Sequence, residues 1–438
     1  MRFPGGLLQA LPTGAVPFIL VLLTSFSAHS DPAESLGLGF GGRSTAGAMA
    51  GSRQGEWSSV FYNPAGLGFV PRPHAALSGV YVHSMLSPEE ARSTQGSFLE
   101  IGAALPLWRL GGVPVWFGGG ALMPTSGFYE IDIYPVEEPT YGLYNSRERR
   151  LSLSIGLGAR PLSWLALGAS MQMLPTVTAE VDLDLANSRG PNTLKVGVGY
   201  RLNPIVGLML LPHKSLSVGL TWRGENRTRL DLPVSVDAEG VNLEARIGAI
   251  TFFVPHKVTL GAMWELEGTG LSAGASLAWH NFSAMPHPST EVALLDSGGA
   301  DTLGTKPPAL GADDILSGAV SVGWQGPVEL RLGYRFTPNP LGEATGDTNL
   351  LGGNEHLWTF GLRLALLGRG CVGPADEPDT GADSAGSTSL CLNTTLFGAY
   401  VSENRHYKEM FEPENPGFPS IEAGGVRMGL SLGVEARY

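Results

Sequence analysis

Three short patterns in the sequence contain residue types that could do chemistry. Residues 429–433, Gly-Leu-Ser-Leu-Gly, match the G-x-S-x-G pattern, which in many hydrolases places a nucleophilic serine on a turn between a strand and a helix. Here the pattern lies within a segment that alternates like a strand, and the scattered histidines give Ser431 no obvious partner. The sequence therefore predicts no enzyme.

The other two patterns could bind phosphate or a cation, but both are isolated. Gly37, Gly39 and Gly42 match G-x-G-x-x-G, yet no strand is expected before them and no βαβ unit follows. Asp182 and Asp184 are a weak calcium candidate, because no cluster of metal ligands surrounds them. We therefore predict neither a cofactor nor a metal.

The elements that must position these residues are predicted to be β-strands. Residues 151–158, 215–222 and 328–336 alternate between apolar side chains and small, polar or charged ones. A period of two is the pattern of a strand with one apolar face. A soluble sandwich would show the same alternation, so the periodicity alone does not decide between a sandwich and a barrel.

The number of strands and the lengths of their connections favour a barrel. Many connections alternate between tight turns and long loops, as in outer-membrane barrels with an even number of strands. Seven of the nine tryptophans fall near strand ends or faces, where interfacial girdles would place them. We predict an all-β fold, a 14-stranded antiparallel transmembrane β-barrel over residues 73–438. Its strands are expected at 74–86, 95–107, 112–124, 147–161, 163–176, 193–203, 214–231, 241–263, 270–283, 314–325, 326–338, 354–367, 388–403 and 422–438.

Composition agrees with an exported membrane protein. Only 16% of the 438 residues are charged, where roughly a quarter is usual for soluble proteins. The net charge of −12 argues against a nucleic-acid partner. Residues 1–30 are expected to be a signal peptide, with Arg2, an apolar core at 16–26 and a small-x-small site at 28–30.

Residues 31–72 are predicted to be a plug inside the barrel. Their first part consists of small residues, and Phe61 and Tyr62 are too apolar for a solvated linker. The dipeptide Asn63-Pro64, which Ala65 follows, is typical of a turn. We therefore expect this segment to be buried inside the predicted barrel.

The only two cysteines, Cys371 and Cys391, bracket an acidic insertion at 369–387 that falls where a short turn is expected. An exported chain allows disulfides, and each cysteine lies near the base of the same predicted hairpin. We therefore predict a structural disulfide, since two thiols are too few for a metal site.

Asn63-Pro64-Ala65, after a small-residue N terminus and before some fourteen strands, resembles the outer-membrane long-chain fatty-acid and hydrocarbon transporters of the FadL family. Residues 216–230, 254–266, 330–340 and 352–364 also look similar to that family. The resemblance implies passive uptake of a hydrophobic small molecule across the bacterial outer membrane, without a cofactor. Its other expected partners are outer-membrane lipid and, during biogenesis, the barrel-assembly machinery.

The family resemblance also implies sideways exit through a gap in the wall. Residues 112–124 contain two prolines and three consecutive glycines, so Gly118, Gly119 and Gly120 are the candidates for a poorly paired strand. The equal alternative is that glycine simply fits a crowded wall. We expect Phe61, Tyr62 and Asn63 to lie near this gap, although packing of Phe61 and Tyr62 against the inner wall explains them as well.

Arg331 and Arg335 are candidates for binding a carboxylate head group, because a guanidinium matches a carboxylate. Pairing with lumenal acids such as Glu329 and Glu435 is the alternative. A further alternative concerns the whole chain: related barrels can act as secretion or surface-assembly partners rather than transporters. The sequence does not identify the hydrophobic substrate.

Overall fold

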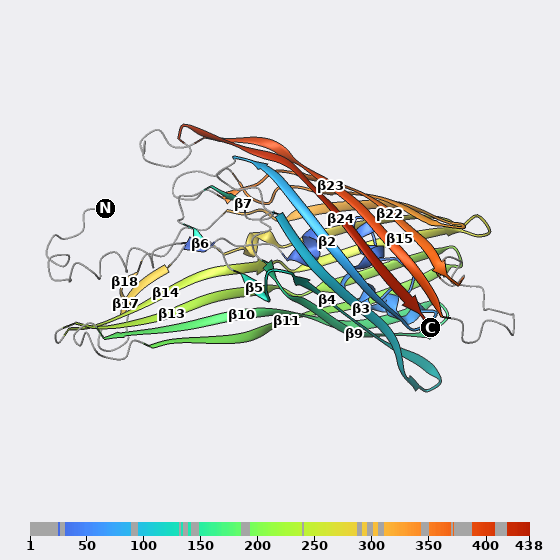
Figure 1. Cartoon of the computed structure of the whole chain (residues 1–438), viewed down its shortest axis with the longest axis horizontal. Coiled ribbons are helices and arrows are strands. Elements are labelled where there is room, and N and C mark those ends of the chain that lie inside the picture. Colours follow the sequence, from blue (N-terminus) through green and yellow to red (C-terminus); the bar gives the residue numbers. More distant parts are fainter. Residues whose placement is uncertain are drawn as a thin grey trace.

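The computed structural model describes residues 25–26, 31–88, 95–130, 133–134, 139–141, 149–184, 193–238, 241–286, 291–295, 301–304, 311–342, 350–368, 371, 388–407 and 418–438. Over these residues the chain forms a closed antiparallel barrel of fourteen wall strands, which confirms the predicted fold class (Figure 1). The expected signal peptide lies outside the described residues except for Ser25 and Phe26.

The wall closes because its first and last strands pair with each other. His74 at the start of the first strand is paired with Arg437 of the last strand and with Ala104 of the second. In chain order the wall strands are β2 (His74–Ser87), β3 (Gln95–Leu110), β4 (Val113–Pro124), β9 (Ser152–Leu162), β10 (Leu165–Asp184), β11 (Thr193–His213), β12 with β13 (Leu216–Arg223, Asn226–Ala238), β14 with β15 (Val241–Val254, Lys257–Leu266), β16 (Leu271–His280), β19 (Ile315–Gln325), β20 (Glu329–Thr337), β22 (Glu355–Leu367), β23 (Ser389–Tyr407) and β24 (Ser420–Arg437).

Short elements extend this wall. β17 (Glu291–Leu295) pairs with β14 and with β18 (Asp301–Gly304). Three two-residue pairs lie outside the barrel ladder: β1 (Ser25–Phe26) with β6 (Ile133–Tyr134), β5 (Tyr129–Glu130) with β8 (Arg149–Arg150), and β7 (Thr140–Tyr141) with β21 (Leu350–Leu351). A 3₁₀ turn, η3 (Phe282–Ala284), follows β16.

Most predicted strands match the observed ones to within about five residues, but those predicted at 163–176, 193–203 and 214–231 end seven to ten residues too early. One of these predicted ends, residue 203, directly precedes Pro204, which lacks the N–H of a ladder. In the structure β11 continues to His213, and its pairing with β12 begins only at Ile205, so the missing donor falls where the ladder starts. The carbonyl of Pro204 accepts a hydrogen bond from the backbone N–H of Gly224 at 2.9 Å.

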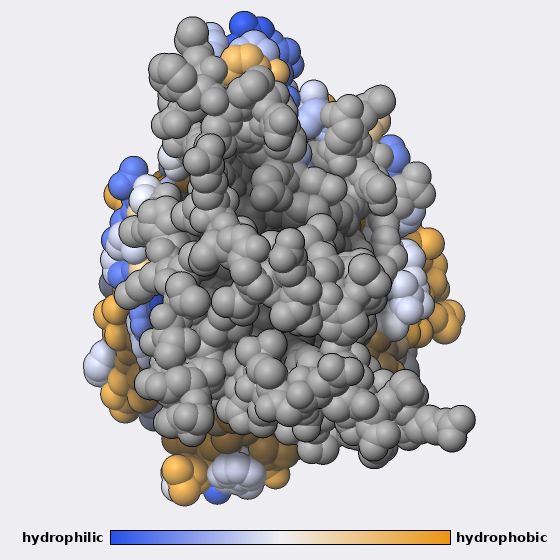
Figure 2. All heavy atoms as spheres, turned by 90° about the vertical axis from the view of Figure 1, so that its left-hand side faces the viewer, coloured by the Kyte–Doolittle hydropathy of each residue, from blue (hydrophilic) through white to orange (hydrophobic). Residues whose placement is uncertain are grey.

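Alternation along the strands separates an apolar outer face from a polar inner face. Leu260, Leu277 and Val320 point outward and are about half exposed, whereas Ser276 and Ser317 on the same strands point inward. Trp264 and Trp324 lie near one end of their strands, and Trp279 and Trp358 lie near the opposite end of theirs. Hydrophobic residues are visible along the outer sides of the barrel (Figure 2). An apolar band between two girdles of aromatic residues is the typical outer surface of a transmembrane β-barrel.

Among the described residues, no helix is long and apolar enough to cross a membrane.

The N-terminal segment, residues 31–72, lies inside the barrel, where Figure 1 draws it in blue. It contains three short helices, α2 (Pro32–Leu36), α3 (Gly39–Ser44) and α4 (Ser59–Tyr62), and the 3₁₀ helix η1 (Pro64–Phe69). The Asp31 carboxylate caps α2 by accepting from the N–H of Ala33, and the Asn63 amide oxygen caps η1 by accepting from the N–H of Ala65. The caps matter because each helix is too short to be stable alone.

A disulfide joins Cys371 to Cys391, which lies in β23. Of the sequence between them, residues 372–387 lie outside the described residues, as do residues 369 and 370.

Candidate functional site

The first contact between the N-terminal segment and the wall is a buried ion cluster around Glu56. One oxygen of the Glu56 carboxylate accepts from Arg331 of β20 and from Arg363 of β22, each at 3.1 Å. Glu329 also accepts from both guanidinium groups, at 2.6 Å from Arg331 and 3.0 Å from Arg363. Phe40 of α3 lies under the two guanidinium groups, with centroid distances of 4.8 and 4.3 Å. Arg331 is therefore paired with the protein's own carboxylates. Its pairing with Glu329 is the alternative that the sequence offered to binding of a head group.

The second contact holds α3 against β3 and β24. Arg43 donates to the Glu100 carboxylate at 3.0 Å and to the Ser431 hydroxyl at 3.0 Å. Glu100 also accepts from the backbone N–H of Gly39 at 2.7 Å. The serine of the G-x-S-x-G pattern thus lies in the middle of β24 and accepts a hydrogen bond from an arginine of the N-terminal segment, which is a structural role.

The third contact places Asn63-Pro64 against the backbone of four neighbouring strands. The Asn63 amide donates to the carbonyls of Ala50 and Leu208, at 2.6 and 3.2 Å. A Cβ on the facing glycines would lie 2.0 to 2.4 Å from atoms of Asn63 or Pro64, or 1.7 Å from the carbonyl oxygen of Ala50. We call these glycines the glycine seat: Gly158 of β9, Gly168 of β10, Gly207 of β11 and Gly219 of β12.

The glycines expected to open the wall are paired on both sides instead. In β4, Gly118 pairs with Ala104 and Gly156, Gly119 with Ala103 and Ile155, and Gly120 with Gly102 and Ser154. The wall is therefore closed at this point, which corrects the expectation of a gap. These glycines have a different use, because a Cβ on Gly118 would lie 2.5 Å from Leu67 and one on Gly120 would lie 2.1 Å from Trp57.

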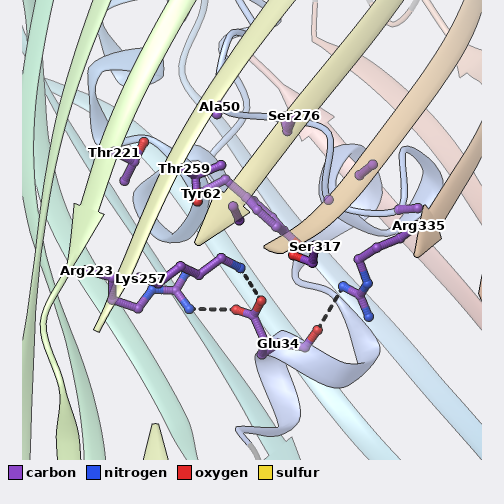
Figure 3. Close-up of a pocket in the computed structure, with 14 residues that line it drawn as sticks. Glu34, Ala50, Tyr62, Thr221, Arg223, Lys257, Thr259, Ser276, Ser317 and Arg335 are labelled. Carbon is purple, nitrogen blue, oxygen red and sulfur yellow. Dashed lines mark hydrogen bonds and ion pairs between the residues drawn. The ribbon is translucent and has the colours of Figure 1, made fainter. Parts of the chain in front are cut away.

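A small polar cavity remains between α2 and the wall (Figure 3). Its volume is about 40 Å³, and four of its lining residues are charged. The Glu34 carboxylate accepts from Arg223 of β12 at 2.7 Å and from the ammonium group of Lys257 of β15. Arg335 of β20 donates to the backbone carbonyl of Glu34 at 3.3 Å and to the Glu355 carboxylate at 3.1 Å. Three strands thus converge their cations on one short helix.

Electrostatics favour the ionised form of Glu34. Burial alone would raise the pKa of this carboxyl, but Lys257 and Arg223 outweigh it and hold the pKa well below its ordinary value. Tyr62, which also lines the cavity, has its pKa raised to about 12 by burial. The cavity therefore contains a carboxylate and a neutral phenol at neutral pH.

An apolar cluster lies next to this cavity, near the ends of the strands that line it. Phe253, Phe282, Met285, Ile315 and Leu341 are buried together. The His280 ring stacks on Phe282 with a centroid distance of 5.9 Å and is hydrogen-bonded to Ser317, a cavity residue, at 2.8 Å. This packed, buried cluster therefore reaches the lining of the cavity through His280 and Ser317.

The structure separates the residues that the sequence singled out. Phe61 is buried under the Arg223 guanidinium, 3.9 Å from the ring centroid, and Asn63, Pro64 and Ala65 belong to the glycine-seat contact. Tyr62 and Arg335 are the two predicted residues that line the cavity.

Sequence reasoning missed Glu34, Arg223 and Lys257, the ionic centre of the cavity. The sequence contained one usable signal. Side chains along a strand alternate between the two faces of the wall, and Arg223 and Lys257 are charged residues at inward-facing positions. Their partner on α2 carries no such pattern.

Several solved structures share this architecture at low sequence identity. A Pseudomonas aeruginosa FadL homologue is similar with a TM-score of 0.57 and 13% identity, covering 92% of this chain and 98% of that one. The Ralstonia pickettii toluene transporter TbuX gives a TM-score of 0.55 at 13% identity, with the same coverage of 92% and 98%. The CymD monoaromatic hydrocarbon channel gives a TM-score of 0.51 at 13% identity, and the match covers 92% of this chain and 98% of that one. No protein-family model and no curated protein matches the sequence. The chain therefore has the fold of FadL homologues and hydrocarbon transporters, as the resemblance of its motifs predicted.

Proposed function

We propose that this protein takes up hydrophobic compounds passively across the bacterial outer membrane. Its substrates are long-chain fatty acids or similar lipids and hydrocarbons. The observation that carries the proposal is the continuity of the apolar cluster around Phe253 and Phe282 with the cavity at Glu34. Apolar side chains next to a few convergent polar groups are the usual composition of a small-molecule site.

In this proposal the N-terminal segment acts as a plug. Glu56, Arg43 and Asn63 fix it to the wall through buried ion pairs and hydrogen bonds that reach β3, β11, β20, β22 and β24. Removing one partner of a buried ion pair is costly, so this part of the segment stays in place during passage. A plug held in this way is incompatible with a wide aqueous pore.

A fixed plug leads the substrate sideways. Lateral exit into the bilayer keeps an apolar molecule away from water and is the route we propose. Because β4 is paired on both sides at Gly118–Gly120, exit there requires local separation of strands. The fold of the toluene transporter and hydrocarbon channel supports the proposal, since those proteins pass hydrophobic molecules on the same architecture.

The proposal is tested by mass spectrometry of lipophilic molecules that co-purify with the detergent-solubilised barrel. Proteoliposome uptake of a radiolabelled fatty acid and of toluene gives the second readout. We expect a bound fatty acid or hydrocarbon and uptake above that of empty liposomes. A variant without residues 31–72 should lose the retained molecule. A folded barrel that binds and passes nothing apolar, but captures a secretion or surface protein, would support the assembly-partner alternative.

A further inference from the structure

A hollow in the outer face of the wall is separate from the contacts described above. Its volume is about 530 Å³, within the range of about 300–1,000 Å³ that is common for small-molecule sites. It crosses five neighbouring strands, β12, β15, β16, β19 and β20, and we call it the outer groove. Its outward-facing side chains are apolar apart from the hydroxyl of Tyr334, so its lining suits a hydrocarbon.

Small residues form the floor of the outer groove, and larger ones form its sides. The strand register places Ala262 beside Ala275, and Gly318 beside Leu277. A Cβ on Gly318 would have nothing within 4 Å, so the space above this glycine is open. Leu277 and Val320 stand next to the small residues and are about half exposed. A low floor between raised sides fits a narrow, chain-like ligand better than a flat partner.

The outer groove lies back to back with the inner cavity. Ser276 and Ala319 line both, so a single layer of the sheet separates the cavity from the lipid-facing surface at these two positions. β16 is nevertheless paired along its whole length with β15 and β19. The wall is therefore thin but closed here, and the outer groove is a surface site rather than an opening.

Aromatic residues give the outer groove an apolar setting and one polar end. Along β15 and β16 its residues lie between the levels of Trp264 and Trp279, within the apolar band. Tyr334 and Phe336 line its β20 side, and their ring centroids lie 6.2 and 5.0 Å from that of His356. The Tyr334 hydroxyl is hydrogen-bonded to Nδ1 of His356 at 2.8 Å. Tyrosine rings of membrane proteins favour the headgroup level, so this side is the polar end.

We propose that the outer groove binds a hydrocarbon chain of an outer-membrane lipid. The polar end of the lipid lies toward Tyr334 and His356, and the chain crosses the small-residue floor toward Val218. Lipid chains surround this band, and close packing rather than exclusion of water holds one of them in the groove. The bound chain adds a layer where the wall over the cavity is thin. This inference does not depend on the proposed function.

A second copy of the protein is a poorer occupant. A two-fold axis through the outer groove would bring the same surface of both copies together. One hollow would then face an identical hollow, and the small-residue floor would stay unfilled. A lipid chain has no such restriction, because it is narrow and flexible.

The test uses phosphatidylethanolamine with a photoreactive diazirine in one acyl chain, added to dioleoylphosphatidylcholine vesicles that contain the protein. After irradiation, mass spectrometry of peptides maps the cross-linked positions. We expect the labels to concentrate on β15, β16 and β19. A diazirine next to the ester should label β20, and one at the end of the chain should label β12. Even labelling of all outward-facing strands would overturn the proposal.

Gly318→Leu fills the outer groove at a position where open space accepts the side chain. It should reduce the labelling of β15, β16 and β19 to the level of the rest of the wall. Gly79→Leu in β2 is the matched control, because this lipid-facing glycine also has nothing within 4 Å of its Cβ position but lies outside the groove. Unchanged heat-dependent gel migration shows that both variants are folded. Wild-type labelling in Gly318→Leu would mean that no chain occupies the groove.

Val320→Cys distinguishes a lipid from a second copy. The two native cysteines are joined in a disulfide, so this variant carries one free thiol, at the side of the outer groove. Dimers formed by a short bis-maleimide in the same vesicles, without lipid labels on β16, would show that a second copy covers the groove. Labelling that is lost in Gly318→Leu and kept in Gly79→Leu supports the lipid.

Discussion

Gly207 of the wall and Asn63 of the N-terminal segment are in such close contact that a single methyl group would not fit between them. A Cβ at position 207 would lie 2.0 Å from the amide oxygen of Asn63. That amide cannot move freely, because it caps η1 and donates to the carbonyls of Ala50 and Leu208. The wall glycine and the plug asparagine therefore depend on each other.

Gly207→Ala is expected to destabilise the protein by about 1–3 kcal/mol, the usual cost of overpacking. Denaturant unfolding in detergent, followed by the heat-dependent shift in gel migration, measures this cost. Gly79→Ala in β2 is the matched control, since nothing lies within 4 Å of its Cβ position. Equal stability of the two variants would show that Asn63 adapts and that the seat is loose.

Within β4, two adjacent glycines should respond differently to the same change. A Cβ on Gly120 would lie 2.1 Å from the Trp57 ring, whereas one on Gly119 would lie 3.1 Å from the edge of Phe117, a flexible neighbour. We expect Gly120→Ala to lower the midpoint of thermal unfolding and Gly119→Ala to change it little. The reverse order would mean that the tight packing lies on the outer face of β4.

Removing the Glu56 carboxylate should be among the most damaging single changes. Glu56→Ala leaves Arg331 and Arg363 buried with one fewer partner, and breaking a buried pair costs about 3–5 kcal/mol. The matched control is Glu422→Ala, which breaks the ion pair with Arg405, where both side chains are more than half exposed. An exposed pair of this kind contributes little. Similar unfolding curves for both variants would contradict the proposed anchoring of the plug.

The docking of α2 should depend on acid pH. The pKa of Glu34 is lowered by docking, so its contribution is complete above the ordinary value of 4.5 and is lost as pH falls through the lowered pKa. The charged and titratable groups around it are Lys257, Arg223, His280, Arg335 and Asp31. The mobility of a spin label at Ser35→Cys should therefore stay constant from pH 7 to pH 5 and rise only in stronger acid.

Glu34→Gln separates this effect from titration of Asp31, because Asp31 is present in both proteins. In the Glu34→Gln protein, the label's mobility should lack the acid transition assigned to Glu34. If the same transition persists in that variant, another group controls α2.

Sequence reasoning was sufficient for the wall and insufficient for the contacts across it. A period of two is visible in each strand by itself, so strands such as β15 and β19 were found within a few residues. The glycine seat depends on the register between β9, β10, β11 and β12, which places glycines far apart in sequence beside one residue of the plug. Single-strand periodicity contains no information about that register.

The same limit applies to the two groups of candidate residues in the wall. Gly118–Gly120 suggested a weak strand. In the structure the missing side chains of Gly118 and Gly120 leave room for Leu67 and Trp57, and no local sequence pattern connects these residues. Arg331 and Arg335 look equivalent in sequence, yet Glu56 lies beside the first and the cavity beside the second. Which arginine is available depends on where residues 34 and 56 of the plug lie.

The position of the glycine seat has a consequence for the order of assembly. β9 to β12 are consecutive in the chain, so the surface that receives Asn63-Pro64 is complete when residue 223 has been added to the sheet. The ring itself is completed only when β2 meets β24, the strand at the far end of the sequence. A sheet of these four strands can therefore receive the N-terminal segment before the ring is closed. If the segment is seated at that stage, the closing barrel encloses it and no threading into a finished barrel is needed.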